Sequence, residues 1–359
     1  MKVMYGALMA GMLALPVPVP VQAQETISLT VASSHPTVVP WVGMIQTHFM
    51  ARTDEILAQT GTYRIAWNEA FGGQLYKANA TLTSVEEGIT DVGWVFSFLE
   101  QAKLPLSQAS SNAPFASANP PAILAVMEEL YETNEAFRNE WEQHNLKVLG
   151  FTATDLYDIY TKTPLTGIDD IAGMKISAPG VLGNWLRGTD ANAVDGALTT
   201  YYTDVQTGVS DGVLTLALGA LPIKLYEVAP IINRFDAGGA FSGAIAINRD
   251  SWDGLPEEVQ NAMIEAGKHY TVSHGEDLVA RHEGALNKMV ELGAGQSVPV
   301  QIVDMPEGEL AKWANKLPNV AREWAEPLDA RGIPASEFLA AYLEALRARG
   351  EVPVRDWDK

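Results

Sequence analysis

The sequence contains no cysteine among its 359 residues, which excludes disulfide bonds and thiol chemistry. Positive charge is also scarce: 24 lysines and arginines stand against 44 aspartates and glutamates, a formal net charge of −20. Nucleic-acid binding requires basic patches, so this balance argues against a nucleic-acid partner. The negative charge is consistent with two interpretations, an acidic surface that maintains solubility or a field that attracts cationic ligands.

Motifs for metal-dependent and nucleotide-dependent chemistry are missing as well. The six histidines form neither an HExxH pair nor a close cluster, and the sequence has no phosphate-binding glycine loop. We therefore predict no metal site and no cofactor. His269, His274 and His282 fall on stretches with helical character, where we expect them at solvated surfaces.

One pattern favours an enzyme. Residues 208–212 read Gly-Val-Ser-Asp-Gly and match the nucleophile elbow of hydrolases, and Asp236 and His269 follow in the order of a catalytic triad. That elbow requires a strand before the serine and a helix after it. The opposite order is expected here, because Gly208 is suited to end a helix and 213–218 is an apolar run typical of a strand. We interpret the chain as a non-enzyme and keep a secreted hydrolase using Ser210 as a remote alternative.

Long apolar runs are confined to the N-terminus. Lys2 precedes an apolar stretch at 5–15 that is too short to cross a membrane, and Val21-Gln22-Ala23 resembles a signal-peptidase site. We predict that residues 1–23 are a signal peptide, cleaved near Ala23. No later run reaches the roughly 20 apolar residues of a membrane span. The mature protein is therefore expected in the periplasm, without membrane insertion of its own.

A helix–glycine–strand pattern occurs twice, far apart in the chain. Residues 85–92 read Val-Glu-Glu-Gly-Ile-Thr-Asp-Val, and residues 205–212 read Val-Gln-Thr-Gly-Val-Ser-Asp-Gly. In each copy the glycine, Gly88 or Gly208, supplies the left-handed residue that ends a helix. The separation exceeds the roughly 20–50 residues of solenoid repeats, so the pattern indicates two similar α/β lobes.

The region around the second copy also carries a family resemblance. Residues 170–177 read Asp-Ile-Ala-Gly-Met-Lys-Ile-Ser and are similar to an Asp-Leu-x-Gly-x-Lys-Ile-Arg strand, and 205–212 resemble a Leu-Gln-Thr-Gly-x-x-Asp-Gly helix end. Further matches are Gly73-Gln74-Leu75, Ala113-Pro114-Phe115 and the segment 252–260. Over nearly the whole mature chain, the sequence resembles the periplasmic solute-binding proteins of tripartite ATP-independent periplasmic (TRAP) transporters, the DctP family named for C4-dicarboxylate uptake.

This resemblance implies an α/β fold of the two-lobed periplasmic-binding-protein kind, with the ligand in the cleft between the lobes. We assign 24–148 and 236–272 to lobe I, and 149–235 and 273–359 to lobe II, with a helical C-terminal region. No linker rich in glycine or serine occurs, so structured crossings should act as the hinge. The implied partners are a small-molecule solute and the membrane permease subunits of a TRAP transporter.

Candidate ligand contacts lie at the carboxyl ends of predicted strands, which face the ligand crevice in α/β sheets. His35 follows the strand 26–32, although it could equally cap a helix or lie in solvent, and Glu69 follows the strand 64–67. The strand 92–96 brings an aromatic side chain to the same place. The full set of candidates in both lobes is His35, Glu69, Trp94, Phe96, Asp155, Tyr157, Ser177 and Thr215.

The resemblance fails at the residues that hold an anion. In the family, an arginine follows the Lys-Ile pair and binds the ligand carboxylate through its guanidinium fork, but here the position is Ser177. A second arginine expected near 156–157 is absent, and a ligand-contacting asparagine is replaced at about Thr215.

The acidic candidates Glu69 and Asp155 instead favour a cationic partner, because a buried charge needs a counter-charge. We therefore predict an amine-bearing or neutral solute, such as an amino-alcohol. The alternative is a C4-dicarboxylate or another organic acid, with Arg187 or Arg234 replacing the missing arginine.

Overall fold

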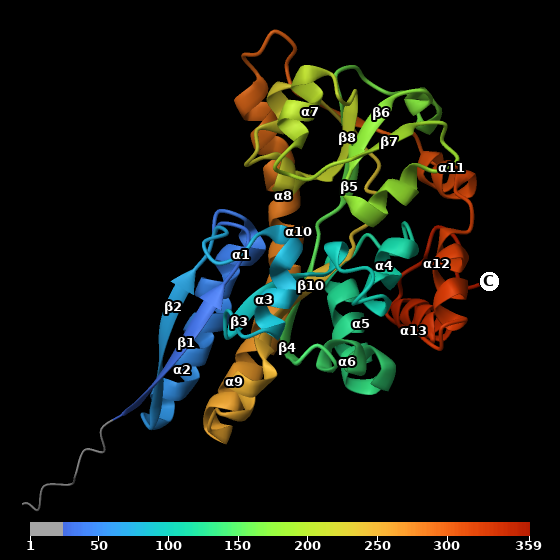
Figure 1. The fold of residues 1–359 in the computed structure, drawn as a ribbon. Coiled ribbons are helices and arrows are strands. Elements are labelled where there is room, and N and C mark those ends of the chain that lie inside the picture. The colour runs from blue at the N-terminus through green and yellow to red at the C-terminus, as the bar shows by residue number, and fades with distance from the viewer. Residues whose placement is uncertain (1–23) are drawn as a thin grey trace, which may run out of the picture.

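The computed structural model describes residues 24–359, so the predicted signal peptide and its cleavage near Ala23 lie outside the described residues. Two separate β-sheets form the framework of the molecule, and helices cover them (Figure 1). The predicted α/β fold with two lobes is confirmed.

The first lobe is built on a five-stranded sheet with the order β2-β1-β3-β10-β4. β1 runs parallel to β2 and β3, whereas β10 is antiparallel to β3 and β4. The central strands β3 and β10 are buried along nearly their whole length, as strands covered on both faces should be. The strands are β1 (Glu25–Ala32), β2 (Tyr63–Ala70), β3 (Val92–Phe96), β4 (Leu146–Ala153) and β10 (Phe241–Asn248).

The second lobe is built on a six-stranded sheet with the order β11-β9-β5-β8-β6-β7. β6 runs parallel to β7 and β8, and β9 runs parallel to β11, whereas β5 is antiparallel to β8 and β9. The strands are β5 (Tyr157–Thr161), β6 (Lys175–Ala178), β7 (Asn192–Asp195), β8 (Gly212–Leu216), β9 (Ile231–Arg234) and β11 (Gln301–Asp304).

Thirteen α-helices are found within residues 24–359. They are α1 (Pro40–Met44), α2 (Ala51–Thr60), α3 (Thr81–Glu86), α4 (Ala109–Asn112), α5 (Pro120–Thr133), α6 (Glu135–Glu142), α7 (Tyr201–Thr207), α8 (Ala217–Ala220), α9 (Arg249–Asp253), α10 (Glu257–Gly293), α11 (Glu309–Lys316), α12 (Val320–Asp329) and α13 (Ala335–Ala348). Residues 120–142 form two helices, α5 and α6, rather than one. The division occurs because the side chain of Asn134 accepts the backbone N–H of Phe137 and so begins a new helix.

The repeated motif starts a central strand in each sheet. Gly88 follows α3 with φ +69°, and Gly208 caps α7 with φ +78°, so the predicted glycine positions are confirmed. In the first lobe, Asp91 Oδ2 accepts a backbone N–H of β1 at 2.7 Å. In the second lobe, Asp211 Oδ2 accepts a backbone N–H of β6 at 2.8 Å. The two motifs therefore have the same structural role: the aspartate before β3 bonds to the parallel strand β1, and the aspartate before β8 bonds to the parallel strand β6.

The longest helix, α10, runs along both lobes (Figure 1). It packs on β4 and α5 in the first lobe and contacts α8 and β11 in the second. The closest approach to β4 is at Gly267, where an added Cβ would lie 1.9 Å from the carbonyl oxygen of Leu149. A residue without a side chain is therefore required for this helix to lie directly on the strand.

Two short segments connect the sheets, and we call them the hinge. Residues 154–156 lead from β4 to β5, and residues 235–240 lead from β9 back to β10. The segments are hydrogen-bonded to each other: Thr154 N donates to the Ala240 carbonyl at 2.9 Å, and Ala237 N donates to the Tyr157 carbonyl at 3.0 Å. The crossings are thus ordered, as the lack of a flexible linker predicted.

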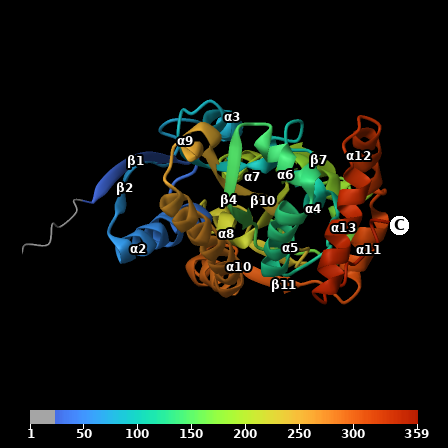
Figure 2. The same cartoon turned by 90° about the horizontal axis from the view of Figure 1, so that it is seen from below.

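The observed elements divide differently from the predicted lobe boundaries in two places. β4 pairs with β10 as far as Ala153, so the chain changes sheets after Ala153 rather than at residue 149. After α11, the chain returns to the first lobe, where α12 and α13 contact α4 and α13 also contacts α5 (Figure 2). The ring of Phe338 on α13 lies 4.9 Å from that of Phe137 on α6, because the apolar side of this terminal helix is buried against the first lobe. The lobe assignment as a whole stays a prediction.

Candidate functional site

The carboxyl ends of central strands from both sheets come together at one place, which we call the interlobe junction. Phe98 follows β3 and Gly180 follows β6, and a Cβ added to Gly180 would lie 3.7 Å from the Phe98 carbonyl oxygen. Close by in the chain, Trp185 donates from Nε1 to the Ser111 carbonyl oxygen at 2.7 Å and so ties the second lobe to the first.

Three predicted ligand residues form an aromatic group in the first lobe. The ring of His35 lies edge-on to Trp94 at 5.2 Å and to Phe96 at 5.9 Å, and the rings of Trp94 and Phe96 are stacked at 5.1 Å. Trp94 Nε1 donates to Thr152 Oγ1 at 3.0 Å, which fixes the indole. Burial lowers the pKa of His35, so its imidazole is neutral at pH 7. Trp94 is fully buried, so the group presents only the partly exposed rings of His35 and Phe96.

In the second lobe, Ser177 and Thr215 lie on neighbouring strands. β6 and β8 are paired so that Ser177 is opposite Val213, and therefore Ser177 and Thr215 share one face of the sheet. Ser177 is fully buried, and its Oγ has no hydrogen-bond partner among the residues that the structure describes. Tyr157 is also buried, with its ring 5.5 Å from that of Trp185, and burial strongly raises its pKa.

Glu69 does not join these residues. It is exposed near the end of the edge strand β2 and accepts a hydrogen bond from Gln46, in the π-helical turn before α2. Trp67, two residues earlier on the same face of β2, packs on Phe49 and donates to Asp54 at 3.1 Å. That face of β2 therefore lies against the helices on the outside of the first lobe.

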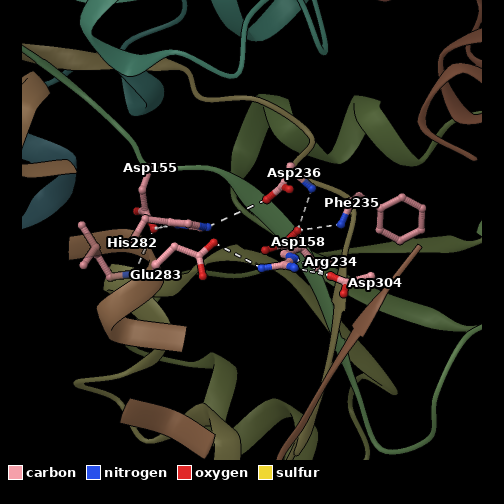
Figure 3. Close-up of polar contacts among 9 residues, drawn as sticks. Asp155, Asp158, Arg234, Phe235, Asp236, His282, Glu283 and Asp304 are labelled. Atoms are coloured by element: carbon pink, nitrogen blue, oxygen red, sulfur yellow. Dashed lines mark hydrogen bonds and ion pairs between the residues drawn. The ribbon is translucent and has the colours of Figure 1, made fainter. Parts of the chain in front are cut away.

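Asp155 is instead part of the hinge (Figure 3). Its side chain is buried, and Oδ2 accepts from the backbone N of Leu218 at 3.1 Å and from Nδ1 of His282 at 3.0 Å. Nearby, Asp158 Oδ1 accepts the backbone N–H groups of Phe235 and Asp236 at 2.8 and 3.0 Å. Asp155 thus holds α10 and the start of α8 against the crossing segment.

The surroundings of Asp158 and His282 raise the pKa of both side chains. Burial, together with the charge of Asp236, raises the pKa of Asp158 to about 7. Burial alone would lower the pKa of His282, but the hydrogen bond to Asp155 and the charges of Asp155, Asp158 and Asp236 outweigh it, so the pKa is raised. The hinge therefore concentrates negative charge around one imidazole.

The expectation that His274 and His282 lie at solvated surfaces is wrong. Both are buried on α10, at 0% and 6% exposure, whereas His269 is exposed. Their spacing contained the signal that could have found this: Tyr270, Leu278 and Leu286 alternate with them at every fourth position, which is typical of one buried helix face.

Neither arginine proposed as a substitute anion ligand is free of partners. Arg187 forms an ion pair with Glu323 of α12. Arg234 Nε donates to Asp304 at 2.6 Å, and its Nη1 lies 3.2 Å from Glu283. Each guanidinium is thus committed to carboxylates of its own chain.

Two pockets among the described residues stand out, and each is lined by one of the two arginines named as alternative anion ligands rather than by any of the eight candidate ligand residues. One of about 270 Å³ lies beside the hinge, with Arg234, Asp236, Asp304 and Leu310 in its wall. The other, of about 330 Å³, lies where both lobes meet α12 and is lined by Gln108, Asn112, Asn184, Arg187 and Trp324, among others.

The hydrolase alternative lacks its geometry. Ser210 lies after α7 and before β8, so a helix precedes it and a strand follows, opposite to a nucleophile elbow. It is fully buried, and within residues 24–359 its Oγ has no hydrogen-bond partner. His269 is elsewhere and stacks on His48 at 5.8 Å. These residues form no catalytic triad.

The fold and the sequence agree with one protein family. The model of "Bacterial extracellular solute-binding protein, family 7" (DctP) matches residues 44–327. The chain belongs to this family. Its members are the extracytoplasmic solute-binding receptors of TRAP transporters, which bind small molecules and work with TRAP permeases rather than catalyse reactions. The resemblance inferred from the sequence, and the interpretation as a non-enzyme, are confirmed.

Curated relatives of the chain are distant and differ in ligand. A C4-dicarboxylate-binding periplasmic protein DctP of Rhodobacter capsulatus is 27% identical over 62% of this chain and 67% of its own length. The ectoine-binding periplasmic protein TeaA of Halomonas elongata is 23% identical over 64% of this chain and 66% of its own length. A solute-binding protein of Sulfitobacter sp. strain NAS-14.1 is 26% identical, but the match covers only 46% of that protein.

Solved structures support the fold. A TRAP solute-binding protein of Rhodoferax ferrireducens, in complex with copurified benzoate, superposes with a TM-score of 0.78 at 17% identity and covers 90% of this chain and 98% of its own. A TRAP periplasmic solute-binding protein of Desulfovibrio salexigens in an open complex has a TM-score of 0.74 at 20% identity, with 90% and 96% coverage.

The family is periplasmic, in agreement with the localisation expected from the sequence. Within the described part of the chain, no helix combines the length and apolar character that a bilayer crossing requires. Cleavage near Ala23 stays a prediction, because residues 1–23 are outside the described residues.

Proposed function

We propose that this DctP-family protein captures a small amine-bearing or neutral polar solute at the interlobe junction and delivers it to the permease of a TRAP transporter. The observation that carries the proposal is Ser177. By resemblance to the family, its position on β6 is that of the arginine that holds a ligand carboxylate. A hydroxyl can hydrogen-bond to a solute, but it cannot neutralise an anion.

The two arginines that could have replaced it support the same conclusion. Arg187 is paired with Glu323, and Arg234 is paired with Asp304 and Glu283. Releasing either guanidinium to a ligand would break an existing ion pair, so neither supplies a ready anion site.

The two carboxylates that we expected to pair with an ammonium group of the solute are not placed to do so. Glu69 faces the outside of the first lobe, and Asp155 is bound within the hinge. An amine would therefore have to rely on the partly exposed ring of Phe96, since Trp94 is fully buried, and an aromatic ring face can contribute about 0.5–2 kcal/mol to cation binding. A neutral solute would use the same surface together with the hydroxyl of Ser177.

An organic acid is the second candidate, because several relatives bind organic acids. One relative is named for C4-dicarboxylate binding, and the solved structures include complexes with benzoate and β-D-galacturonate. The ectoine-binding relative shows that the family is not restricted to dicarboxylates.

A thermal-shift screen over amines, neutral polyols and carboxylates tests the proposal. A ligand at 100 times its Kd stabilises the folded state by about 2.7 kcal/mol, which shifts the melting temperature measurably. Shifts confined to amines or neutral compounds are expected. Shifts confined to succinate-like or aromatic acids would contradict the proposal.

Two serines of equal burial provide a matched pair of variants. Ser177 and Ser210 are both fully buried, and the structure shows no hydrogen-bond partner for either hydroxyl among residues 24–359. Ser177→Ala should weaken binding of the solute found in the screen by roughly 2–10-fold, the loss of one hydrogen bond. Ser210 precedes the amino end of β8, whereas Ser177 lies near the carboxyl end of the parallel strand β6. The Ser210→Ala variant should therefore bind the solute normally. Calorimetry measures both, and equal affinities in all three proteins would exclude Ser177 from the site.

A further inference from the structure

Three side chains from separate elements converge at the hinge (Figure 3). Asp158 comes from β5, Asp236 from the crossing 235–240, and His282 from α10. One carboxylate oxygen of each aspartate and a ring nitrogen of His282 lie within 4.8 Å of one another. The three are widely spaced in the sequence, so the histidine spacing could not reveal the group.

Two of these side chains are buried and point unpartnered polar atoms into the group. Asp158 is 0% exposed and His282 is 6% exposed. Asp158 Oδ2 and His282 Nε2 have no hydrogen-bond partner anywhere in the described chain. Leaving such atoms unsatisfied costs free energy, so their presence in a buried site requires an explanation.

The hydrogen bond of the other ring nitrogen, Nδ1, determines whether Nε2 of His282 carries a proton or a lone pair. Asp155 Oδ2 accepts from the backbone of Leu218, and as an ionised carboxylate oxygen it also accepts from His282 Nδ1 at 3.0 Å. In the neutral imidazole, Nε2 then carries a lone pair directed at Asp158 and Asp236. A carboxylate that orients a histidine in this way is the usual support of a metal-binding imidazole.

The separation of the atoms suits a metal ion better than a hydrogen bond. His282 Nε2 lies 3.9 Å from Asp236 Oδ1, beyond hydrogen-bond distance. Zinc binds nitrogen and oxygen ligands at about 2.0–2.2 Å, so that two of its ligands lie about 3.3–3.6 Å apart in a tetrahedral site. Small rotations of the side chains would therefore complete such a site. Asp236 is free to make one, since 49% of its side chain is exposed.

The local charge also favours a cation. Asp155, Asp158 and Asp236 surround a single imidazole, while the nearby guanidinium of Arg234 is directed to Asp304 and Glu283. Asp236 borders the pocket of about 270 Å³ beside the hinge, which gives an ion a route from solvent.

From this geometry we infer a binding site for a first-row divalent cation of the zinc type, with Asp158, Asp236 and His282 as ligands and a fourth position open to water. A nitrogen donor with only two carboxylates suits zinc better than calcium, which takes six to eight oxygen ligands. The ion would join β5, the returning crossing and α10 at the point where the lobes are connected.

The test uses the mature protein, stripped with a chelator and titrated with Zn²⁺ in competition with a chromophoric indicator. One equivalent of Zn²⁺ should bind to the wild type, and Co²⁺ in its place should show the visible absorption of a four-coordinate site. Asp236→Asn should weaken binding at least as much as the roughly 10–100-fold that loss of a supporting residue costs. This variant should fold, because asparagine tolerates the positive φ of +49° at that position.

His269→Gln is the matched control. His269 is exposed on the same helix and stacks on the partly exposed His48, so this pair is a competing place for adventitious zinc. The control should retain the full equivalent. The inference is overturned if the wild type binds no Zn²⁺, or if the bound equivalent is lost in His269→Gln and kept in Asp236→Asn.

Discussion

Glu69 and Asp155 show how one chemical group takes different roles at two strand ends. Asp155 is buried and accepts hydrogen bonds from Leu218 and His282, whereas Glu69 is exposed on an edge strand and faces Gln46. From the sequence the two are equivalent, because each follows a predicted strand. They differ in the helices that they contact: Asp155 is bonded to α8 and α10, whereas Glu69 is bonded to Gln46 in the π-helical turn before α2. These contacts depend on tertiary structure. A carboxylate at a strand end is therefore not enough to predict a ligand contact.

His274 should make the stability of the protein depend on pH. It is fully buried on α10 with Nε2 3.0 Å from the Ala153 carbonyl oxygen, and burial lowers its pKa from 6.5 to about 4. The unfolded chain therefore takes up the proton first as the pH falls. The stabilisation is complete above pH 6.5 and is lost as the pH falls through about 4.

The expected loss between pH 6.5 and 5 is about 1–2 kcal/mol of unfolding free energy from this residue. His274→Gln cannot take up the proton and should lack that part of the pH dependence. Urea unfolding of both proteins at the two pH values measures the difference. Parallel profiles would show that His274 is not the titrating group.

At the scale of elements, helices and strands that depend on local sequence signals were predicted, whereas those that depend on long-range contacts were not. The glycine-ended helices and the strands that follow them were predicted, since capping glycines and apolar runs act within a few residues. The short strand β7 and the division between α5 and α6 were not. β7 has no buried residue and forms only by pairing with β6, so its own sequence carries little signal.

Two glycines of α10 should respond in opposite ways to the same substitution. Gly267 lies against β4, where a Cβ would meet the carbonyl oxygen of Leu149, whereas Gly284 is exposed with no atom within 4 Å of an added Cβ. Gly267→Ala should cost at least the roughly 1–3 kcal/mol of overpacking, because backbone atoms must move. Gly284→Ala should raise stability by roughly 0.5–1 kcal/mol, because alanine favours a helix over glycine.

Denaturant unfolding of the two single variants tests this pair, with equal slopes confirming that the unfolded state is unchanged. If Gly267→Ala were as stable as the wild type, α10 could not lie as close to β4 as the structure shows.

At the scale of the whole molecule, the sequence predicted two lobes and ordered crossings but not the contents of the hinge. The lobes follow from the repeated motif and from the family resemblance. The group of Asp155, Asp158, Asp236 and His282 assembles only when both crossings and α10 are in place, so no local pattern contains it. For the same reason, the aromatic group of His35, Trp94 and Phe96 could be predicted residue by residue, but its stacked geometry could not.

The arrangement predicts that solute binding closes the two lobes. Each lobe has its own sheet, and the lobes are connected by two short hydrogen-bonded segments, by α10 and by the return of the chain from α11 to α12. Rigid lobes on a narrow connection move as bodies, and a solute that contacts both favours the closed arrangement by its difference in affinity for the two states. Small-angle scattering should therefore give a smaller radius of gyration with the solute identified in the thermal-shift screen than without it. The Ser210→Ala variant should show the same change, since Ser210 lies away from the junction. A scattering profile that stays the same at saturating solute would exclude closure, and the solute would then have to bind to lobes already held together by contacts such as that of Trp185 with Ser111.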